Sequence, residues 1–333
     1  MPRKTATALI GAGAFSLALA VMVPAVIAPA LLKAPGTQDL VTHSRGEAQK
    51  LNSATGELEP ITVDLTRTLT THADAEGNLV GSSSTAVYDE LLNLAVVGPD
   101  GDVQTVDARG RYTGLRAGSS VIAFDRSTGE GVPGEFGETY GTTAHTVKLP
   151  FDTQQTTYDF YDQSSRKGWP VSYTRTLEVD GLEVYEFVGS IPEVSLGQYG
   201  VLEGTDTLYS NPNRTLLVEP VTGSIVSIVS SPQTSIRFAD GKVSPALLVD
   251  ALGPTADTVA GRVADAKDSK SSALLLQRAP WVLGGLGLLL LAGGLLARRR
   301  RTTARADDDL RPDVSHVLPV ARGEAPAEQR LAR

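Results

Sequence analysis

Two long apolar runs stand near the ends of the chain, and the one near the C-terminus gives the clearer pattern. Residues 279–297 contain no charged side chain, and a helix of this length covers roughly 28 Å, close to the hydrocarbon thickness of a bilayer. Trp281 lies at its outer end, and Arg298 to Arg301 follow directly. A buried core helix would have to expose these adjacent arginines. We therefore predict a transmembrane helix whose arginine end faces the cytoplasm.

The first apolar run, residues 5–32, follows a short basic start at residues 1–4. A basic start and an apolar run are typical of a signal peptide, and Ala28-Pro-Ala30 resembles a small-residue cleavage site. A retained transmembrane helix, or uncleaved signal anchor, explains the length of the run better, because it can cross a bilayer with tilt. In both interpretations the chain from residue 35 onward is exported. With a retained helix, both termini are cytoplasmic.

Residues 35–244 instead show apolar and polar side chains that alternate over short stretches, which is the pattern of β-strands. Residues 61–69 place apolar and polar side chains in turn, as in a half-buried strand. Two hairpins are indicated, one joining residues 171–179 to 182–188 through Asp180-Gly181, the other joining 215–221 to 224–229 through Thr222-Gly223. We expect a mainly β (α+β) fold, with an antiparallel β-rich extracytoplasmic domain between an N-terminal and a C-terminal transmembrane helix.

Three further segments complete the predicted organisation. The glycine-rich residues 129–141 predict an irregular surface loop. Helical spacing returns over residues 245–278, in apolar positions that include Leu248, Val259 and Val263, and predicts an amphipathic helical stem before the second span. Residues 298–333 mix charge with proline and alanine, which predicts a disordered cytoplasmic tail.

Charge and composition exclude several classes of function. Residues 5–297 hold 19 basic and 32 acidic groups, a net charge of −13. Nucleic-acid binding depends on clustered Lys and Arg, so no nucleic-acid partner is expected for this acidic body. Cysteine is absent, which excludes disulfides, thiolate metal sites and thiol nucleophiles.

Four segments together resemble a known family. They are Phe124-Asp-Arg-Ser-Thr-Gly-Glu130, then Leu149-Pro-Phe-Asp-Thr-Gln154 with Tyr158-Asp-Phe-Tyr-Asp162, Val179-Asp-Gly-Leu-Glu-Val-Tyr-Glu-Phe187, and Leu217-Val-Glu-Pro-Val-Thr-Gly223. In this order they resemble an actinobacterial family of two-span envelope proteins of unassigned function, commonly labelled "PorA family porin". The resemblance implies an extracytoplasmic domain held between two membrane helices, and it carries no catalytic or pore motif. The layout is also similar to that of class B scavenger receptors, which bind lipids.

The family motif positions have structural explanations. Asp-Gly and Thr-Gly fit hairpin turns, the aromatic residues fit core or edge positions, and Arg126 can pair with Glu130 beside its turn. The positions are Asp125, Arg126, Thr128, Gly129, Pro150, Phe151, Tyr158, Asp162, Gly181, Tyr185, Pro220, Thr222 and Gly223.

No set of residues with a recognisable catalytic pattern occurs. G-x-S-x-G and H-E-x-x-H are both missing, although His145 could belong to a Ser-His-Asp site assembled from distant segments. A cation could bind at Asp100, Asp102 and Asp107, but the spacing departs from that of an EF-hand, and a solvated turn explains it better. Asp152, Asp159 and Asp162 stand beside aromatic residues, as in sugar-binding sites, without a spacing that identifies one. We expect no enzyme, no cofactor and no metal.

These patterns favour a non-enzymatic protein of a bacterial plasma membrane. Its β-rich domain is expected to bind or pass an apolar envelope ligand such as a lipid, or to dock an envelope partner. Oligomers could form through the spans, where Gly293 and Ala297 are a small-residue pair. A porin-like channel component is the first alternative, and a hydrolase with an unrecognised site is the second.

Overall fold

The computed structural model describes residues 3–104, 114–134, 136, 141–200 and 202–309. The chain divides into two compact units. One unit combines residues 1–22 with residues 279–333, and the other is residues 23–278. The predicted positions Asp107 and residues 310–333 lie outside the described residues.

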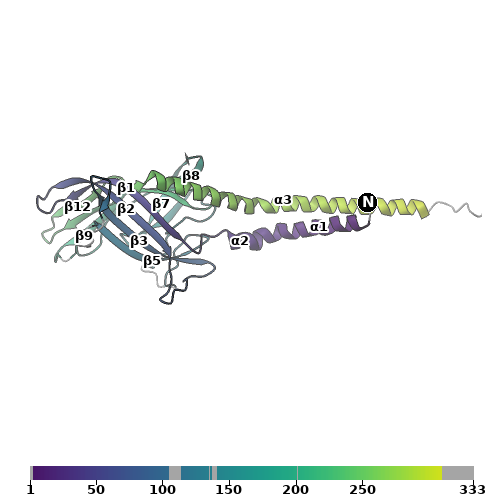
Figure 1. Cartoon of the computed structure of the whole chain (residues 1–333), viewed down its shortest axis with the longest axis horizontal. Helices are drawn as coiled ribbons and strands as arrows, with labels where there is room; N and C mark the ends of the chain where they lie inside the picture. The colour runs from purple at the N-terminus through teal and green to yellow at the C-terminus, as the bar shows by residue number, and fades with distance from the viewer. Residues whose placement is uncertain (1–2, 105–113, 135, 137–140, 201, 310–333) are drawn as a thin grey trace, which may run out of the picture. The chain divides into compact units, whose positions relative to one another are not determined.

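The first unit contains two helical segments from opposite ends of the chain (Figure 1). They belong to α1, Arg3–Met22, and to α3, Ala256–Asp309. Two candidate spans, Thr5–Leu31 and Ala256–Arg299, are long and apolar enough to cross a membrane. Glycines let the helices approach closely: a Cβ on Gly287 would lie 2.9 Å from the Gly13 carbonyl oxygen, and one on Gly294 would lie 2.7 Å from Cγ1 of Ile10.

Proline shapes the end of the first span. Val23–Ile27 form a π-helical turn that contains Pro24, followed by α2, Ala28–Leu31. Proline cannot donate the backbone hydrogen bond of a regular helix, which explains the irregular turn. Within the chain, the helix contact is made by Gly287 and Gly294, and Gly293 has nothing within 4 Å of an added Cβ. The role of Gly293 and Ala297 in oligomers stays a prediction.

Thirteen strands of the described residues form one sheet. They are β1 Asp39–Leu51, β2 Leu58–Thr71, β3 Thr85–Val97, β4 Val103–Gln104, β5 Arg116–Asp125, β6 Thr157–Asp162, β7 Lys167–Val179, β8 Leu182–Ser195, β9 Asp206–Val218, β10 Ile225–Ser230, β11 Gln233–Arg237, β12 Val243–Val249 and β13 Gly253–Pro254. The named strands pair antiparallel throughout, as predicted.

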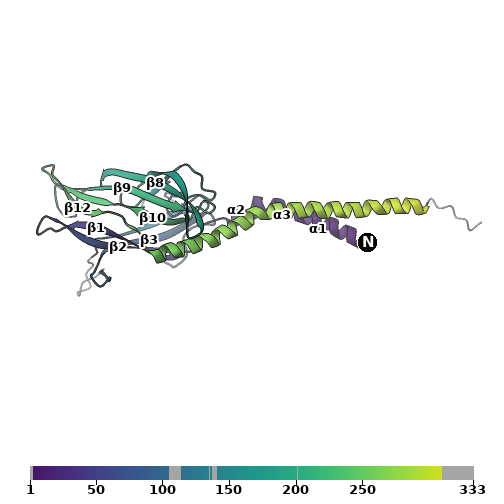
Figure 2. The same cartoon turned by 90° about the horizontal axis from the view of Figure 1, so that it is seen from above.

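The sheet curls until its edges meet. Strands follow the order β3-β2-β1-β12-β11-β9-β8-β7-β6, with β5 beside β3. Single bridges then connect the two edges: Phe124 of β5 with Gly131, Glu130 with His145, and His145 with Phe160 of β6. Figure 2 shows β1, β2 and β3 on one side of the domain and β8, β9 and β12 on the other. The hydrogen-bonded ring therefore encloses an interior.

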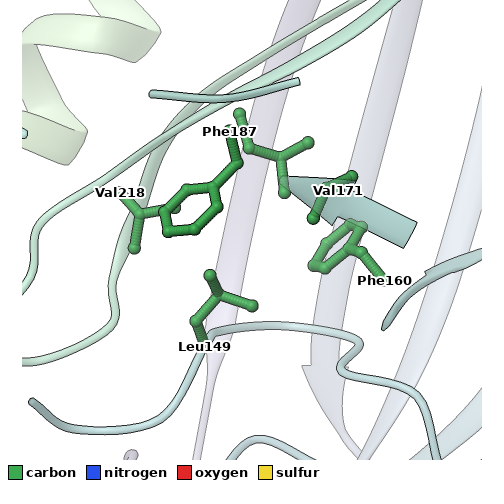
Figure 3. Packing of buried hydrophobic residues seen from close by; sticks show 6 residues of the cluster. Leu149, Phe160, Val171, Phe187 and Val218 are labelled. Atoms are coloured by element: carbon green, nitrogen blue, oxygen red, sulfur yellow. The ribbon is translucent and has the colours of Figure 1, made fainter. Parts of the chain in front are cut away.

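Both predicted hairpins are present. β7 and β8 turn at Asp180 and Gly181, whose φ angles of 48° and 74° are the positive values of a tight hairpin. β9 and β10 are joined through Gly223, with φ of 73°. Leu149, Phe160, Val171, Phe187 and Val218 from the strands and the loop before β6 pack into one buried cluster (Figure 3).

The predicted stem begins later than expected. Residues 243–249 form β12, which pairs with both β1 and β11, and the helix begins only at Ala256. Helical spacing at Leu248 was misleading, because pairing on both sides decides the conformation of a short apolar segment. From Val259 onward the prediction is confirmed, since Val263 and Ala266 are buried against Leu182 and Val184 of β8.

Two more predictions are corrected. Residues 298–309 are helical, since α3 continues to Asp309; extending an existing helix needs no new nucleus, and arginine and alanine favour it. The glycine-rich residues 129–141 were predicted to be a surface loop, but the start of this segment is buried. Gly131 is buried and donates its N–H to the Ala144 carbonyl, as part of the ring.

Candidate functional site

The chain that follows the first span runs along a pocket of about 520 Å³, which we call the strap pocket. Its wall combines this strap, residues 31–35 and Gln38, with the domain core and one side of α3. The remaining lining residues are Tyr88, Phe124, Val147, Lys148, Phe151, Thr222, Ser224, Ile225, Arg262, Asp268, Ser269, Ser272, Ala273 and Leu276. Leu31 is the last residue of the first candidate span, and Leu276 lies three residues before the predicted second span at residue 279.

Two side chains of the domain hold the strap. Arg126 donates from Nε to the Ala34 carbonyl at 2.7 Å, and the Ala34 N–H donates to the Arg126 carbonyl at 2.7 Å. Tyr88 donates its hydroxyl to the Pro35 carbonyl at 2.5 Å. Burial raises the pKa of Tyr88 to about 12, so the hydroxyl stays a donor at neutral pH. Arg126 thus bonds to the strap, and the expected pairing with Glu130 is wrong.

The turn that carries Asp125 positions Arg126. Asp125 accepts the N–H groups of Ser127 and Thr128 at 2.8 Å each, and Gly129 closes the turn with φ of 79°. A side chain on Gly129 would meet the Lys148 carbonyl oxygen at 2.4 Å, so this position requires glycine for its close approach as well as its φ.

Two family segments pack on one another beside the strap pocket. The Gly223 carbonyl accepts the Leu149 N–H, and the Pro220 carbonyl accepts the Thr153 N–H at 2.8 Å. Thr153 also donates its hydroxyl to the Pro150 carbonyl at 2.6 Å. An added Cβ on Gly223 would lie 1.9 Å from the Leu149 oxygen, a distance that no side chain allows.

Lys148 stands between these segments and points into the same pocket. Its amine donates to the Ser127 carbonyl at 3.3 Å and lies 3.4 Å from the centre of the Phe151 ring. The residue is 6% exposed, and among the described residues its amine forms no ion pair with a carboxylate. Burial lowers the pKa of Lys148 to about 7, against the opposing attraction of Asp125.

Two lysines of α3 fasten the stem to family turns. Lys270 lies 3.3 Å from the carboxylate of Glu219, which is fully buried and also accepts the Thr222 N–H and hydroxyl at 2.8 Å each. Lys267 donates to the Asp180 carbonyl at 2.5 Å, at the turn that contains Gly181. The hairpin turns therefore serve as contacts for the stem.

Two further spaces follow the strap pocket into the ring. The middle pocket, of about 240 Å³, shares Val147, Ile225 and Arg262 with the strap pocket. The distal cavity, of about 770 Å³, shares with the middle pocket the residues Leu65, Leu92, Gln163, Ser164, Tyr209, Pro232 and Leu252. Pockets that share lining residues are neighbours, so the three spaces form a row separated by side chains.

The distal cavity has a mixed wall, with aliphatic residues on one part of it and Lys50, Arg116, Arg166 and several Ser and Thr residues on the rest. Its lining includes Leu65, Leu92, Leu94, Leu115, Leu196, Leu247, Val249 and Leu252. Gly118 also faces it, because Gly118 pairs with Leu92 across β5 and β3, and paired residues point to the same face. A Cβ added there meets only Oε1 of Gln163, at 3.9 Å. The cavity can therefore be filled from this position.

The remaining predicted positions lie elsewhere in the domain. Tyr158 and Tyr185 pack against the cluster around Phe187, and the Tyr158 hydroxyl accepts the Gln154 N–H at 2.8 Å. Asp162 lines the middle pocket, where it accepts the Tyr209 hydroxyl at 3.0 Å and two bonds from Ser165.

The candidate catalytic histidine has a structural environment. His145 is buried beside the Tyr158 ring, with ring centres 5.3 Å apart, and its Nε2 has no hydrogen-bond partner among the described residues. Burial lowers the pKa of His145 to about 4, so the ring is neutral at pH 7. Among the residues that the structure describes, no group of three or more His, Asp or Glu side chains could hold a metal ion.

Sequence reasoning missed the residues that define the pockets. Lys148, Arg262 and Gly118 stand in three distant segments, and no local motif marks any of them. The signal that could have found Lys148 is its position directly before the Leu149-Pro-Phe segment, which belongs to the family resemblance.

Comparison with known proteins agrees with this architecture. The family described as porin PorA matches residues 5–296. This range covers the first candidate span, the β domain, and the second candidate span except for its last three residues. No curated protein matches the chain. Because the match extends over most of its length, this chain belongs to the porin PorA family.

Proposed function

We propose that the chain is a non-enzymatic envelope membrane protein whose β domain binds the apolar chain of an envelope lipid. The row of three pockets inside the closed sheet carries this proposal. Ligand sites are commonly concave, largely apolar spaces of about 300–1,000 Å³, and the strap pocket and distal cavity are of this size.

The proposed location follows from the two apolar helices and the charge beside them. Arg298 to Arg301 favour a cytoplasmic position for the end of the second span, which leaves the β domain outside. In the chain, the strap pocket includes Leu31, the last residue of the first candidate span.

A matched pair of variants tests the lipid proposal. Gly118→Phe places an aromatic ring in the distal cavity, whereas Leu91→Phe adds a similar ring on the exposed face of β3, where Leu91 is 52% exposed. The full chain, extracted from membranes into amphipol, is examined by native mass spectrometry for retained lipid. We expect lipid on the wild type and on Leu91→Phe, and at least about 10-fold less on Gly118→Phe. Equal retention by all three proteins contradicts the proposal.

A channel component is the second candidate, because the chain belongs to the porin PorA family and its pockets form a row. The purified full chain is added to planar bilayers, with a known porin as the positive control. Conductance steps that Gly118→Phe reduces support a path through the domain. A chain that gives no steps while the control conducts contradicts this candidate.

The proposal of a non-enzymatic role is supported by the surroundings of His145, where no hydroxyl among the described residues bonds to the ring. Esterase, glycosidase and phosphatase substrates test it, with His145→Ala on any positive result. Hydrolysis by the wild type that this substitution abolishes contradicts the non-enzymatic proposal.

A further inference from the structure

Charge is distributed unevenly between the interior and the rest of the chain. Residues 5–297 hold 19 basic and 32 acidic groups, yet the described residues that line the three pockets include eight basic and three acidic side chains. The basic ones are Lys33, Lys50, Arg67, Arg116, Lys148, Arg166, Arg214 and Arg262, and the acidic ones are Glu90, Asp162 and Asp268. The lining of the three pockets is therefore net positive in an otherwise acidic protein.

Several of these cations already have a bonded partner. Arg67 lies 2.6 Å from the Glu90 carboxylate, and Arg214 donates to the carbonyls of Phe160 and Tyr161. Arg67 and Arg214 therefore have structural roles, and their presence in the lining does not require a ligand. Lys33 and Arg116 donate to the Ser83 carbonyl and the Ser164 hydroxyl. Lys50, Arg116 and Arg166 are exposed, which leaves Lys148 and Arg262 to be explained.

Arg262 is the cation at the junction of two pockets. It lines both the strap pocket and the middle pocket, and among the described residues its guanidinium makes no hydrogen bond or ion pair. Arg67 repels it from the middle pocket, while Asp265, on the same helix, attracts it. Burial is the main reason that the pKa of Arg262 falls to about 10. A guanidinium has five N–H donors, and here none of them meets a protein oxygen.

Lys148 lines the same pocket from another part of the fold, the segment before Leu149. Its amine makes one hydrogen bond to a carbonyl and one contact with a ring, and neither supplies negative charge. Burying a cation without an anion is unfavourable, and a bound anion would remove much of that cost. Two such cations thus border one pocket from two elements.

We propose that the lipid has an anionic head group, which binds in the strap pocket between Lys148 and Arg262, while its apolar chain runs through the middle pocket into the distal cavity. This inference rests on the proposed lipid-binding function and adds the chemical class of the ligand. Carboxylate and phosphate oxygens both accept charged hydrogen bonds from an amine and a guanidinium. The Leu and Val residues of the distal cavity would contact the chain.

The test compares head groups on one apolar chain. The delipidated full chain in amphipol is titrated with hexadecanoate, hexadecyl phosphate and hexadecanol, and binding is measured by native mass spectrometry. The same titrations use Lys148→Met, Arg262→Met and the exposed control Lys242→Met, whose side chain is 83% exposed. Arg262→Lys keeps the charge in case Arg262→Met fails to fold.

We expect at least one of the two anions to bind about 10-fold or more tightly than hexadecanol, since a hydrogen bond to a charged group contributes about 1.5–3 kcal/mol. The variants at Lys148 and Arg262 should lose this preference but keep the affinity for hexadecanol, and Lys242→Met should keep both. The anion that binds more tightly identifies the head group as carboxylate or phosphate.

Two results overturn the inference and leave the proposed function intact. One is equal binding of all three compounds by the wild type, and the other is an anion preference that survives both substitutions. If none of the compounds binds, the proposed lipid-binding function fails together with the inference.

Discussion

Lys148 should make the folding stability of the ligand-free protein depend on pH above neutrality. Its pKa in the folded domain is about 7, because the amine is buried, compared with 10.5 for an ordinary lysine. Between these values the unfolded chain binds the additional proton, so the free energy of unfolding rises with pH. The stabilisation is complete above 10.5 and is lost as the pH falls through about 7.

The size of the effect follows from the two values. Their separation corresponds to about 5 kcal/mol over the whole window, at close to 1.4 kcal/mol per pH unit in its middle. Between about pH 7.5 and about pH 9 the free energy of unfolding should therefore rise by about 2 kcal/mol. His145 does not contribute there, because its pKa is lowered to about 4 and it differs from an unfolded histidine only at lower pH.

Urea unfolding of the full chain in detergent measures this slope. The sequence has two tryptophans, so a Trp281→Phe background leaves Trp169 of β7 as the single fluorescent reporter of the β domain. Lys148→Met should remove the slope and stabilise the protein near pH 7.5 by about 1–4 kcal/mol, because folding no longer has to bury a side chain that is charged in the unfolded chain.

Lys242→Met is the control, since it makes the same substitution at an exposed position and should keep the slope. The reasoning is refuted if Lys148→Met and the wild type show the same change in stability between the two pH values. It is also refuted if stability falls over this range in the wild type alone.

Three further predictions concern contacts within each of the two units. Lys270→Met leaves a buried carboxylate without its cation and should lower the free energy of unfolding by about 2–4 kcal/mol, measured in urea. Gly223→Ala should cost more than about 3 kcal/mol in the same assay; Gly241→Ala has a similar positive φ but open space, so it should cost only about 1–2 kcal/mol. In the helical unit, Gly287→Leu should lower the thermal unfolding temperature in detergent, whereas Gly293→Leu, with nothing within 4 Å, should not.

Structural features that depend on residues close together in the sequence could be predicted from the sequence. The hairpin at Asp180-Gly181 and the apolar helices depend on local backbone preferences and on continuous composition, and both are present in the structure. β1 could not be recognised, because residues 39–51 are mostly polar and become a strand through 13 paired residues of β2. β12 was mistaken for helix for the same reason: its partners are distant in sequence.

The candidate site was predicted only in part, for a related reason. Family positions such as Asp125, Gly129 and Gly223 are recognisable because turns require particular residues. The pocket that these turns surround is lined by Lys148 and Arg262, which come from a loop and a helix over a hundred residues apart in sequence. Their importance depends on a juxtaposition that exists only in the folded chain.

The turns and the residues that line the pocket have different roles, and only the turns are recognisable from the family resemblance. The turns fix how the strap, Lys148 and α3 come together: Arg126 bonds to the strap, and Glu219 bonds to α3 through Lys270. These bonds to the strap and to α3 do not depend on which ligand the pocket holds. If the β domain binds a lipid as proposed, a single change at Gly118 would alter the length of chain that fits and leave this framework intact. We expect the charges of Lys148 and Arg262, rather than the recognisable turns, to decide which head group this chain accepts.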